Sequence, residues 1–190
     1  MTGMAITEPP QRLSDLLVRP AMTADIAAIT AIYRPAVEHG TASFELEPPD
    51  ADEMRRRFDA IVSAGFPYIV AERDRRVLGY AYVSHYRTRP AYRFAVEDSV
   101  YVAADSYGRG VGNALLAELI GQSTALGFRQ MIAVIGDSRQ LSSIALHRSA
   151  GFMFCGTIHS VGYKLGRWID SVIMQLPLGE GDASPARERA

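Results

Sequence analysis

The chain has 190 residues, of which 48% are hydrophobic and 22% charged, and this balance indicates one globular domain of ordinary size. Its formal net charge of −1 argues against bulk electrostatic binding to nucleic acid or to an anionic membrane, so we expect neither as a partner. No apolar run approaches the roughly 20 residues that a membrane-spanning helix needs, and no basic, apolar signal peptide opens the sequence. The single cysteine, Cys155, excludes an intrachain disulfide and favours a reducing, cytoplasmic compartment. Its apolar neighbours predict that Cys155 is a small buried core residue.

The first half of the chain predicts a strand, two helices and then a pair of strands. A short strand is expected over residues 16–19, followed by a helix for which Thr23 is the candidate N-cap. A second helix is expected after Asp50, whose carboxylate can accept a hydrogen bond from a free amide of the first turn. Two strands over residues 67–72 and 77–86 then form a hairpin with a tight turn.

The middle of the chain predicts a strand–helix–strand unit. A strand over residues 94–102 precedes a helix over residues 109–127, and an apolar strand over residues 130–135 follows. Such a unit should form a parallel crossover. A further helix is expected over residues 138–150.

Two final strands, over residues 152–163 and 169–176, complete the fold. We expect a flexible N-terminal extension over residues 1–14, one domain over residues 15–178, and a disordered polar tail over residues 179–190. Because consecutive strands are mostly adjacent, the order predicts an α/β fold of the α+β type, with a mixed, mostly antiparallel central sheet and helices on both faces.

A glycine-rich turn lies between the strand ending at residue 102 and the helix that follows. Residues 107–112 read Tyr-Gly-Arg-Gly-Val-Gly, and no acidic residue follows Ser106 until Glu118. Free amides and the positive end of the helix dipole favour an anion there, and Arg109 adds a cation, so the turn predicts a phosphate or pyrophosphate site. The bland alternative is a tight connection that needs glycine only for packing.

Two nucleotide-binding motifs fit this turn poorly. A dinucleotide-binding fold needs the turn after the first strand and an acidic residue about 20 residues later, and residues 127–135 contain no acid. A nucleotide-triphosphate loop needs Gly-Lys-Ser/Thr, which the turn lacks.

Together with this turn, several separated segments resemble the GCN5-related N-acetyltransferase (GNAT) superfamily, and within it the phosphinothricin and methionine sulfoximine N-acetyltransferases. The resemblance covers residues 16–178. It depends on residues 41–45, 89–102, 107–112, 133–136, 146–148, 151–152, 161–164 and 166–170. Two positions depart from the superfamily pattern: Tyr107 stands where Gln or Arg usually opens the turn, and Gln140 stands where an Asn usually contacts the coenzyme.

The resemblance implies one GNAT domain that transfers an acetyl group from acetyl-CoA to the primary amine of a small amino acid or amino-acid analogue, by direct attack. It also implies a homodimer, and we expect no metal. Alternatives are acetylation of another amine, such as a polyamine, a drug or a protein N-terminus, and a non-catalytic acetyl-CoA sensor. A sensor would keep the glycine turn but has no need of a base.

Direct attack requires a neutral amine, so a base must accept a proton. The resemblance places the family's catalytic Glu at Glu97, where apolar neighbours should raise its pKa; a structural pairing with a nearby arginine is the alternative. Asp98 should point to the opposite face of the strand and is the weaker candidate. His147 is the second catalytic candidate, as an acid for the departing thiolate or as a merely structural histidine.

The resemblance also suggests which residues bind the two substrates. The coenzyme-binding residues would be Val100, Tyr101, Val102, Gly108, Arg109, Gly110, Val111, Gly112, Asn113, Gln140 and Ser143. The amine-binding residues would be Phe44, Glu45, Arg87, Arg89, Tyr92 and Arg93, with Tyr82 beside them. Each arginine could instead lie on a solvated surface or at a dimer contact, and Lys164 and Trp168 could belong to the pocket or to an interface.

Overall fold

The computed structural model describes residues 15–186, so the extension predicted for residues 1–14 and the last four residues of the predicted tail lie outside the described residues. Within this range the chain forms a seven-stranded sheet in the order β1-β2-β3-β4-β5-β7-β6. Neighbouring strands are antiparallel except for the β4–β5 pair. The mixed, mostly antiparallel sheet expected from the sequence is therefore confirmed.

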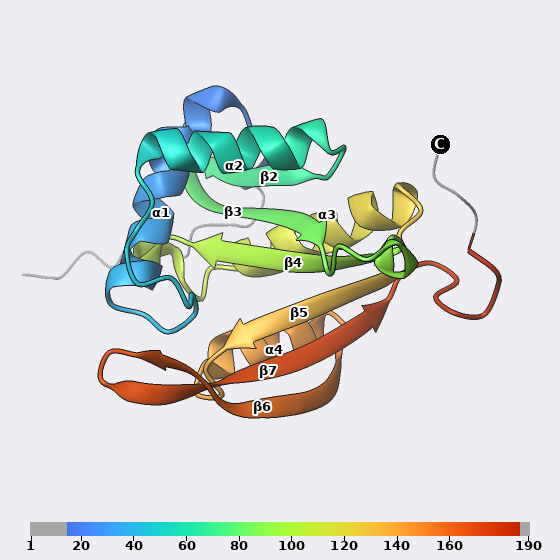
Figure 1. The fold of residues 1–190 in the computed structure, drawn as a ribbon. Helices are drawn as coiled ribbons and strands as arrows, with labels where there is room; N and C mark the ends of the chain where they lie inside the picture. The colour runs from blue at the N-terminus through green and yellow to red at the C-terminus, as the bar shows by residue number, and fades with distance from the viewer. Residues whose placement is uncertain (1–14, 187–190) are drawn as a thin grey trace, which may run out of the picture.

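The helices lie on both faces of this sheet. Figure 1 shows α1 and α2 on the near side and α3 and α4 behind the sheet. The α-helices are α1 (Ile26–Glu38), α2 (Ala51–Ser63), α3 (Val111–Ala125) and α4 (Leu141–Ser149). The strands are β1 (Leu17–Pro20), β2 (Tyr68–Arg73), β3 (Arg76–His85), β4 (Ala95–Val102), β5 (Gln130–Gly136), β6 (Met153–Lys164) and β7 (Arg167–Pro177). Short 3-10 turns occupy Thr23–Asp25, Pro90–Tyr92 and Ala104–Ser106.

Two predicted helix caps have different outcomes. Asp50 caps α2 as expected, because its carboxylate accepts a hydrogen bond from the Glu53 amide at 2.8 Å. The Thr23 cap is wrong, because Thr23 lies inside the 3-10 turn that precedes α1. The Asp25 carboxylate accepts the free amide of Met22 instead, at 2.8 Å. An acidic side chain is the stronger acceptor for an amide at this positive end of the helix dipole.

The parallel crossover runs from β4 through α3 to β5. Gly110 is the N-cap of α3 with φ of 79°, and Gly127 lies just beyond the C-cap with φ of 82°, a backbone region in which residues other than glycine are strained. The helix is therefore shorter at both ends than the residues 109–127 expected from the sequence. The next helix, α4, is likewise shorter than the expected residues 138–150.

The sheet separates two apolar cores. Residues of α3, among them Leu115, Leu116 and Leu119, pack with Val96 and Met131 on one face. On the other face, α1 and α2 pack on a row of aromatic side chains from β2, β3 and β4. These rings are Tyr68, Tyr80, Tyr82 and Tyr101. Because side chains alternate along a strand, neighbouring residues of β4 face different cores.

The last two strands form a long hairpin at the edge of the sheet. The thiol of Cys155 is exposed there, so the predicted burial is wrong. Cys155 lies on β6, at the edge of the sheet, and its local apolar neighbours do not reveal that position. Part of the tail expected to be disordered, residues 179–186, is described by the structure. Arg129 donates to the carbonyls of Gly181 at 2.8 Å and Ser184 at 3.1 Å.

Candidate active site

Strands β4 and β5 separate partway along their length. Their parallel pairing ends at Asp98 and Ala133. Beyond that point β4 continues on β3 as far as Val102, and β5 continues on β7 as far as Gly136. The two strands therefore diverge toward their C-terminal ends, as Figure 1 shows. The wedge between them is bordered by both strands and by His147, and its backbone groups are not joined by strand pairing.

A groove of about 1380 Å³ leads from this wedge to the glycine-rich turn. Its walls are α1, the C-terminal half of β4, the turn and α4. The predicted coenzyme-binding residues that line it are Val100, Tyr101, Val102, Gly108, Gly110, Val111, Gly112, Asn113, Gln140 and Ser143. Arg75 and Arg76, from the β2–β3 turn, also line the groove. No local pattern connects these two arginines with the groove, because the two regions meet only in the folded sheet.

Arg109 lies beside the groove, outside the residues that line it in the described chain. Its positive charge helps to lower the pKa of Asp105, after the larger effects of hydrogen bonds from Arg76 and Ser106. The structure thus places the side chain of Arg109 near an acidic partner. The backbone of the turn, by contrast, faces the groove directly.

The N-terminus of α3 points its free amides into the groove. The first intrahelical hydrogen bond runs from the Ala114 amide to the Gly110 carbonyl, at 3.0 Å. The amides of Val111, Gly112 and Asn113 come before that bond, and no acidic side chain occupies the first turn. Backbone donors and the helix dipole therefore combine into a site suited to phosphate oxygens.

His147 and Asp98 form a buried pair at the wedge. The Nε2 atom of His147 lies 3.0 Å from Oδ2 of Asp98, and its Nδ1 atom lies 2.7 Å from the carbonyl oxygen of Ser143. A carbonyl and a carboxylate both accept hydrogen bonds, so this geometry suits an imidazolium that donates from both nitrogens. Burial lowers the pKa of His147, but the hydrogen bonds and charge of its partners outweigh burial and raise it.

Glu97 lies on the opposite face of β4, and the alternation expected from the sequence is observed. Its side chain is half-buried, and no hydrogen bond or ion pair joins it to another side chain within residues 15–186. Burial raises its pKa, as does the nearby Asp98, while the charge of Arg87 lowers it in part. A carboxyl group with a raised pKa and no strong partner can accept a proton near neutral pH.

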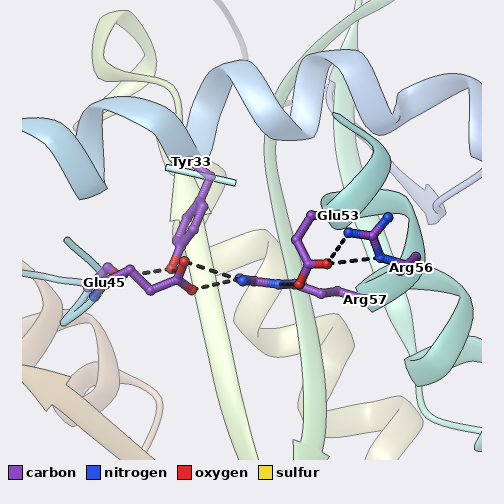
Figure 2. Close-up of polar contacts among 6 residues, drawn as sticks. Tyr33, Glu45, Glu53, Arg56 and Arg57 are labelled. Atoms are coloured by element: carbon purple, nitrogen blue, oxygen red, sulfur yellow. Dashed lines mark hydrogen bonds and ion pairs between the residues drawn. The ribbon is translucent and has the colours of Figure 1, made fainter. Parts of the chain in front are cut away.

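Glu45 is held on the Glu97 face of the sheet by a polar network, drawn in Figure 2. The hydroxyl of Tyr33, on α1, donates to Glu45 Oε1 at 2.9 Å. Arg57, on α2, donates to the same oxygen at 2.6 Å and is itself bound to Glu53 at 2.8 Å. Burial raises the pKa of Tyr33 to about 12, so its hydroxyl remains a donor.

The loop that carries Phe44 and Glu45 packs against the ends of β5 and β6. A Cβ atom on Gly136 would lie 2.5 Å from a loop carbonyl, and one on Gly162 would lie 2.6 Å from the Phe44 ring. Only glycine permits this close approach. The ammonium of Lys164 donates to the Ser43 carbonyl at 2.7 Å, and burial lowers its pKa. Lys164 therefore anchors the loop.

The predicted amine-binding residues of the 86–94 loop are all exposed. Arg87 stacks on the Tyr86 ring, and its charge acts on Glu97. Tyr92 packs edge-on against Tyr86, and Arg93 donates to the Pro90 carbonyl at 3.3 Å. Arg89 immediately precedes the 3-10 turn Pro90–Tyr92. The charge of Arg87 thus acts on Glu97, while Tyr92 and Arg93 make contacts inside their own loop.

Sequence reasoning missed three features of the site. Strand alternation places Asp98 away from Glu97 and makes it the weaker catalytic candidate, yet Asp98 is the partner of His147, 49 positions away. No local pattern connects Tyr33 or Arg57 with the site. The i,i+4 spacing of Glu53 and Arg57 could have signalled an ion pair on α2, but nothing local connects that pair with Glu45.

Within residues 15–186 no three side chains of the kinds that bind metals come together. No helix of that part of the chain is long and apolar enough to cross a membrane.

The splayed parallel strands, the helix N-terminus at the glycine turn and the groove between them define an acetyltransferase of the GNAT class. The sequence model of the Acetyltransferase (GNAT) domain matches residues 18–173, so the chain belongs to this family and is an acetyltransferase.

Three similar proteins carry more specific descriptions. A phosphinothricin N-acetyltransferase of Alcaligenes faecalis is 52% identical over 181 residues, 92% of each chain. An L-methionine sulfoximine/L-methionine sulfone acetyltransferase of Pseudomonas paraeruginosa is 40% identical, covering 88% of this chain and 98% of that protein. The solved structure of a phosphinothricin acetyltransferase from Sinorhizobium meliloti, in complex with AcCoA, superposes with a TM-score of 0.89 at 51% identity and covers 92% of this chain and 94% of that one.

Proposed function

We propose that this enzyme transfers the acetyl group of acetyl-CoA to the α-amino group of a small amino-acid analogue of the phosphinothricin or methionine sulfoximine type. The observation that carries the proposal is the β4–β5 wedge, which opens to the coenzyme groove and has Glu97 on its other side. The substrates that the similar proteins are named for support the choice of amine.

The groove offers binding groups for the pyrophosphate and for the pantetheine arm of acetyl-CoA. The free amides of Val111, Gly112 and Asn113 would hold the pyrophosphate, and Arg75 and Arg76 would add positive charge near the phosphates. The open edge of β4 at Val100 and Val102 would pair with the amides of the pantetheine arm, as an added strand pairs with a sheet edge. The thioester would then lie at the wedge where β4 and β5 diverge. Glu97 would lie on one face of β4 there, and His147 on the other.

Glu97 would accept the proton of the substrate ammonium, directly or through a water molecule. Its pKa is raised, and no ion pair engages it within residues 15–186, which suits it for this task. The neutral amine then attacks the thioester carbonyl carbon, a C–N bond forms, and the C–S bond breaks. The second proton that the nitrogen loses goes to solvent or to the departing thiolate. Free backbone amides at the wedge could donate to the oxyanion that develops on the carbonyl oxygen.

His147 would serve the departing thiolate from the opposite face of β4. Both of its nitrogens are already engaged, by Asp98 and by the Ser143 carbonyl. Its first contribution would therefore be a fixed positive charge near the sulfur. Proton donation to the thiolate would follow only if the Nε2–Asp98 contact opens.

The substrate's ammonium would bind near Glu45 and Glu97, and its acidic group near Arg87. A guanidinium forms paired hydrogen bonds with a carboxylate or phosphinate, and the exposed guanidinium of Arg87 lies close to the proposed base. Phe44, whose ring packs against Gly136 and Gly162, would form the side of the pocket at the ends of β5 and β6.

A homodimer formed through the β6–β7 hairpin is part of the same proposal. Large apolar side chains that are at least half exposed gather on this hairpin, and they favour an interface. They are Met153, Phe154, Ile158, Val161, Tyr163, Leu165 and Trp168. The solution mass of the full chain at assay concentration tests this, and a strictly monomeric mass would contradict it. We place the reaction in the cytoplasm, a reducing compartment compatible with the exposed thiol of Cys155.

The release of free thiol from acetyl-CoA tests the proposed reaction. The purified chain would be incubated with acetyl-CoA and a panel of amines: L-phosphinothricin, L-methionine sulfoximine, proteinogenic amino acids, a polyamine and a short peptide. We expect release with the two amino-acid analogues. Release with the peptide alone would favour a protein N-terminus as substrate, and binding of acetyl-CoA without release with any amine would favour a sensor.

A further inference from the structure

Two arginines in succession on α2 have different surroundings. Arg56 and Arg57 both pair with Glu53, at 2.7 and 2.8 Å. The side chain of Arg56 is 69% exposed, whereas that of Arg57 is 39% exposed and also reaches Glu45 at 2.6 Å. Figure 2 shows Arg57 lying between the two glutamates and Arg56 on the outer side of Glu53. The pair of arginines therefore offers a natural comparison.

Arg57 and Tyr33 together hold the Glu45 carboxylate. Oε1 accepts both the Tyr33 hydroxyl and Arg57 Nη1, and the second nitrogen of Arg57 lies 3.4 Å from Oε2. A glutamate side chain on a loop has several rotatable bonds, and ordering it costs free energy unless such contacts hold it. The same contacts leave most of the capacity of Oε2 for a further donor.

This network lies on the face of the sheet that carries Glu97. The Tyr33 ring packs edge-on against Tyr101, with centroids 4.9 Å apart, and Tyr101 and Glu97 project from the same side of β4. Burial raises the pKa of Tyr82, on β3 beside them, and the charge of Arg57 lowers it while Glu97 and Glu45 raise it further. The charges of Arg57, Glu97 and Glu45 thus all act on Tyr82.

We infer that Arg57 is a positioning residue for the amine substrate, because it fixes the Glu45 carboxylate in the orientation that receives the substrate ammonium. The inference rests on the proposed function, in which Glu45 binds that ammonium. Glu53 extends the arrangement by holding Arg57 from its other side, at Nε. Arg57 acts through Glu45 and takes no part in the acetyl transfer itself.

Steady-state kinetics of Arg57→Gln would test this, with L-methionine sulfoximine as the varied substrate and acetyl-CoA saturating. Loss of a charge-assisted hydrogen bond at this partly exposed position should raise the KM for the amine by about 10-fold, with little change in kcat or in the KM for acetyl-CoA. Arg57→Lys should recover part of the loss, because it keeps the charge without the paired donors. Arg56→Gln is the matched control and should behave as the wild type, because Arg56 contacts Glu53 from the solvent side.

A double-mutant cycle separates positioning from a general effect on the fold. If Arg57 acts through Glu45, Arg57→Gln should add almost nothing to the KM of an enzyme that already carries Glu45→Gln. Tyr33→Phe removes the second contact to Glu45 without changing a charge, and it should raise the amine KM by about 3-fold. Thermal unfolding of each variant would identify any that fail to fold, and Tyr33→Phe keeps the inference testable if Arg57→Gln is one of them.

Each outcome of these experiments either supports this inference or overturns it. Equal amine KM values for Arg57→Gln and Arg56→Gln in an active enzyme would overturn this inference alone. Additive effects of Arg57→Gln and Glu45→Gln would overturn it as well, since Arg57 would then act independently of Glu45. A wild-type enzyme with no activity on any amine would overturn the proposed function, and this inference with it.

Discussion

Glu97 and Asp98 are neighbours on β4 with different surroundings. Glu97 faces the side of α1 and α2, is half-buried, and has no ion pair within the described residues. Asp98 faces α4, is buried, and pairs with His147 at 3.0 Å. Successive side chains along a strand point in opposite directions, so these two neighbouring residues act on opposite faces of β4. An unpaired carboxylate is available for proton transfer, and a paired one fixes its partner.

The largest expected effect is the loss of turnover when Glu97 is replaced. Glu97→Gln keeps the shape of the side chain but removes the proton acceptor, so turnover at neutral pH should fall by roughly 10²–10⁴-fold. The affinity for acetyl-CoA should barely change. Raising the pH should partly rescue the variant, because more of the substrate amine is then neutral. Steady-state kinetics from pH 6 to about 10 would measure this, and near-normal turnover at pH 7 would show that Glu97 is structural.

Replacing Asp98 should lower the unfolding free energy of the protein. Asp98→Asn leaves His147 without its carboxylate in a buried site, and breaking such a pair costs about 3 kcal/mol of unfolding free energy. Chemical denaturation of the variant and the wild type would measure the loss. Glu97→Gln is the matched control, since it should leave the unfolding free energy almost unchanged. Equal stabilities of Asp98→Asn and the wild type would contradict the structural importance of the pair.

A substitution in the glycine-rich turn of the groove should lower the affinity for acetyl-CoA. Gly110→Val places a side chain at the N-terminus of α3, so acetyl-CoA binding measured by calorimetry should weaken by about 10-fold or more. The substitution also strains the backbone, because φ at Gly110 is 79°. Gly127→Val controls for the strain, since φ there is 82° at the other end of the same helix. If both variants bind acetyl-CoA equally well, the pyrophosphate lies elsewhere.

The smallest effect concerns pH and the Asp98–His147 pair. The pKa of His147 is raised in the folded protein above its ordinary value of about 6.5. Its stabilising contribution is therefore fully present below that unfolded value and is lost as the pH rises through the folded pKa. The unfolding free energy of the wild type should carry a component that declines on the alkaline side, and His147→Phe should lack it. Parallel pH profiles for the two proteins would contradict this.

Local patterns predicted most elements of the fold. The periodicity of apolar residues, the Asp50 cap and the glycines after the helices act over a few positions, so the sequence alone carries them. The same is true of the α3 N-terminus, where Gly110 and the absence of acidic residues predict an anion site. The error at Thr23 is local, because the stronger acceptor at Asp25 lies only two residues away. The error at Cys155 arose from tertiary structure, because β6 lies at the edge of the sheet.

The sequence by itself determined the order of strands and helices, the glycine turn and the family of the enzyme, because these are written in neighbouring residues and in segments that relatives share. Tertiary structure alone decided which charged groups meet. Asp98 finds His147 across the β4–α4 contact, and Glu45 finds Arg57 across the loop and α2. The physical reason is that hydrogen bonds between distant side chains depend on how helices pack on the sheet, and sequence spacing does not encode that packing.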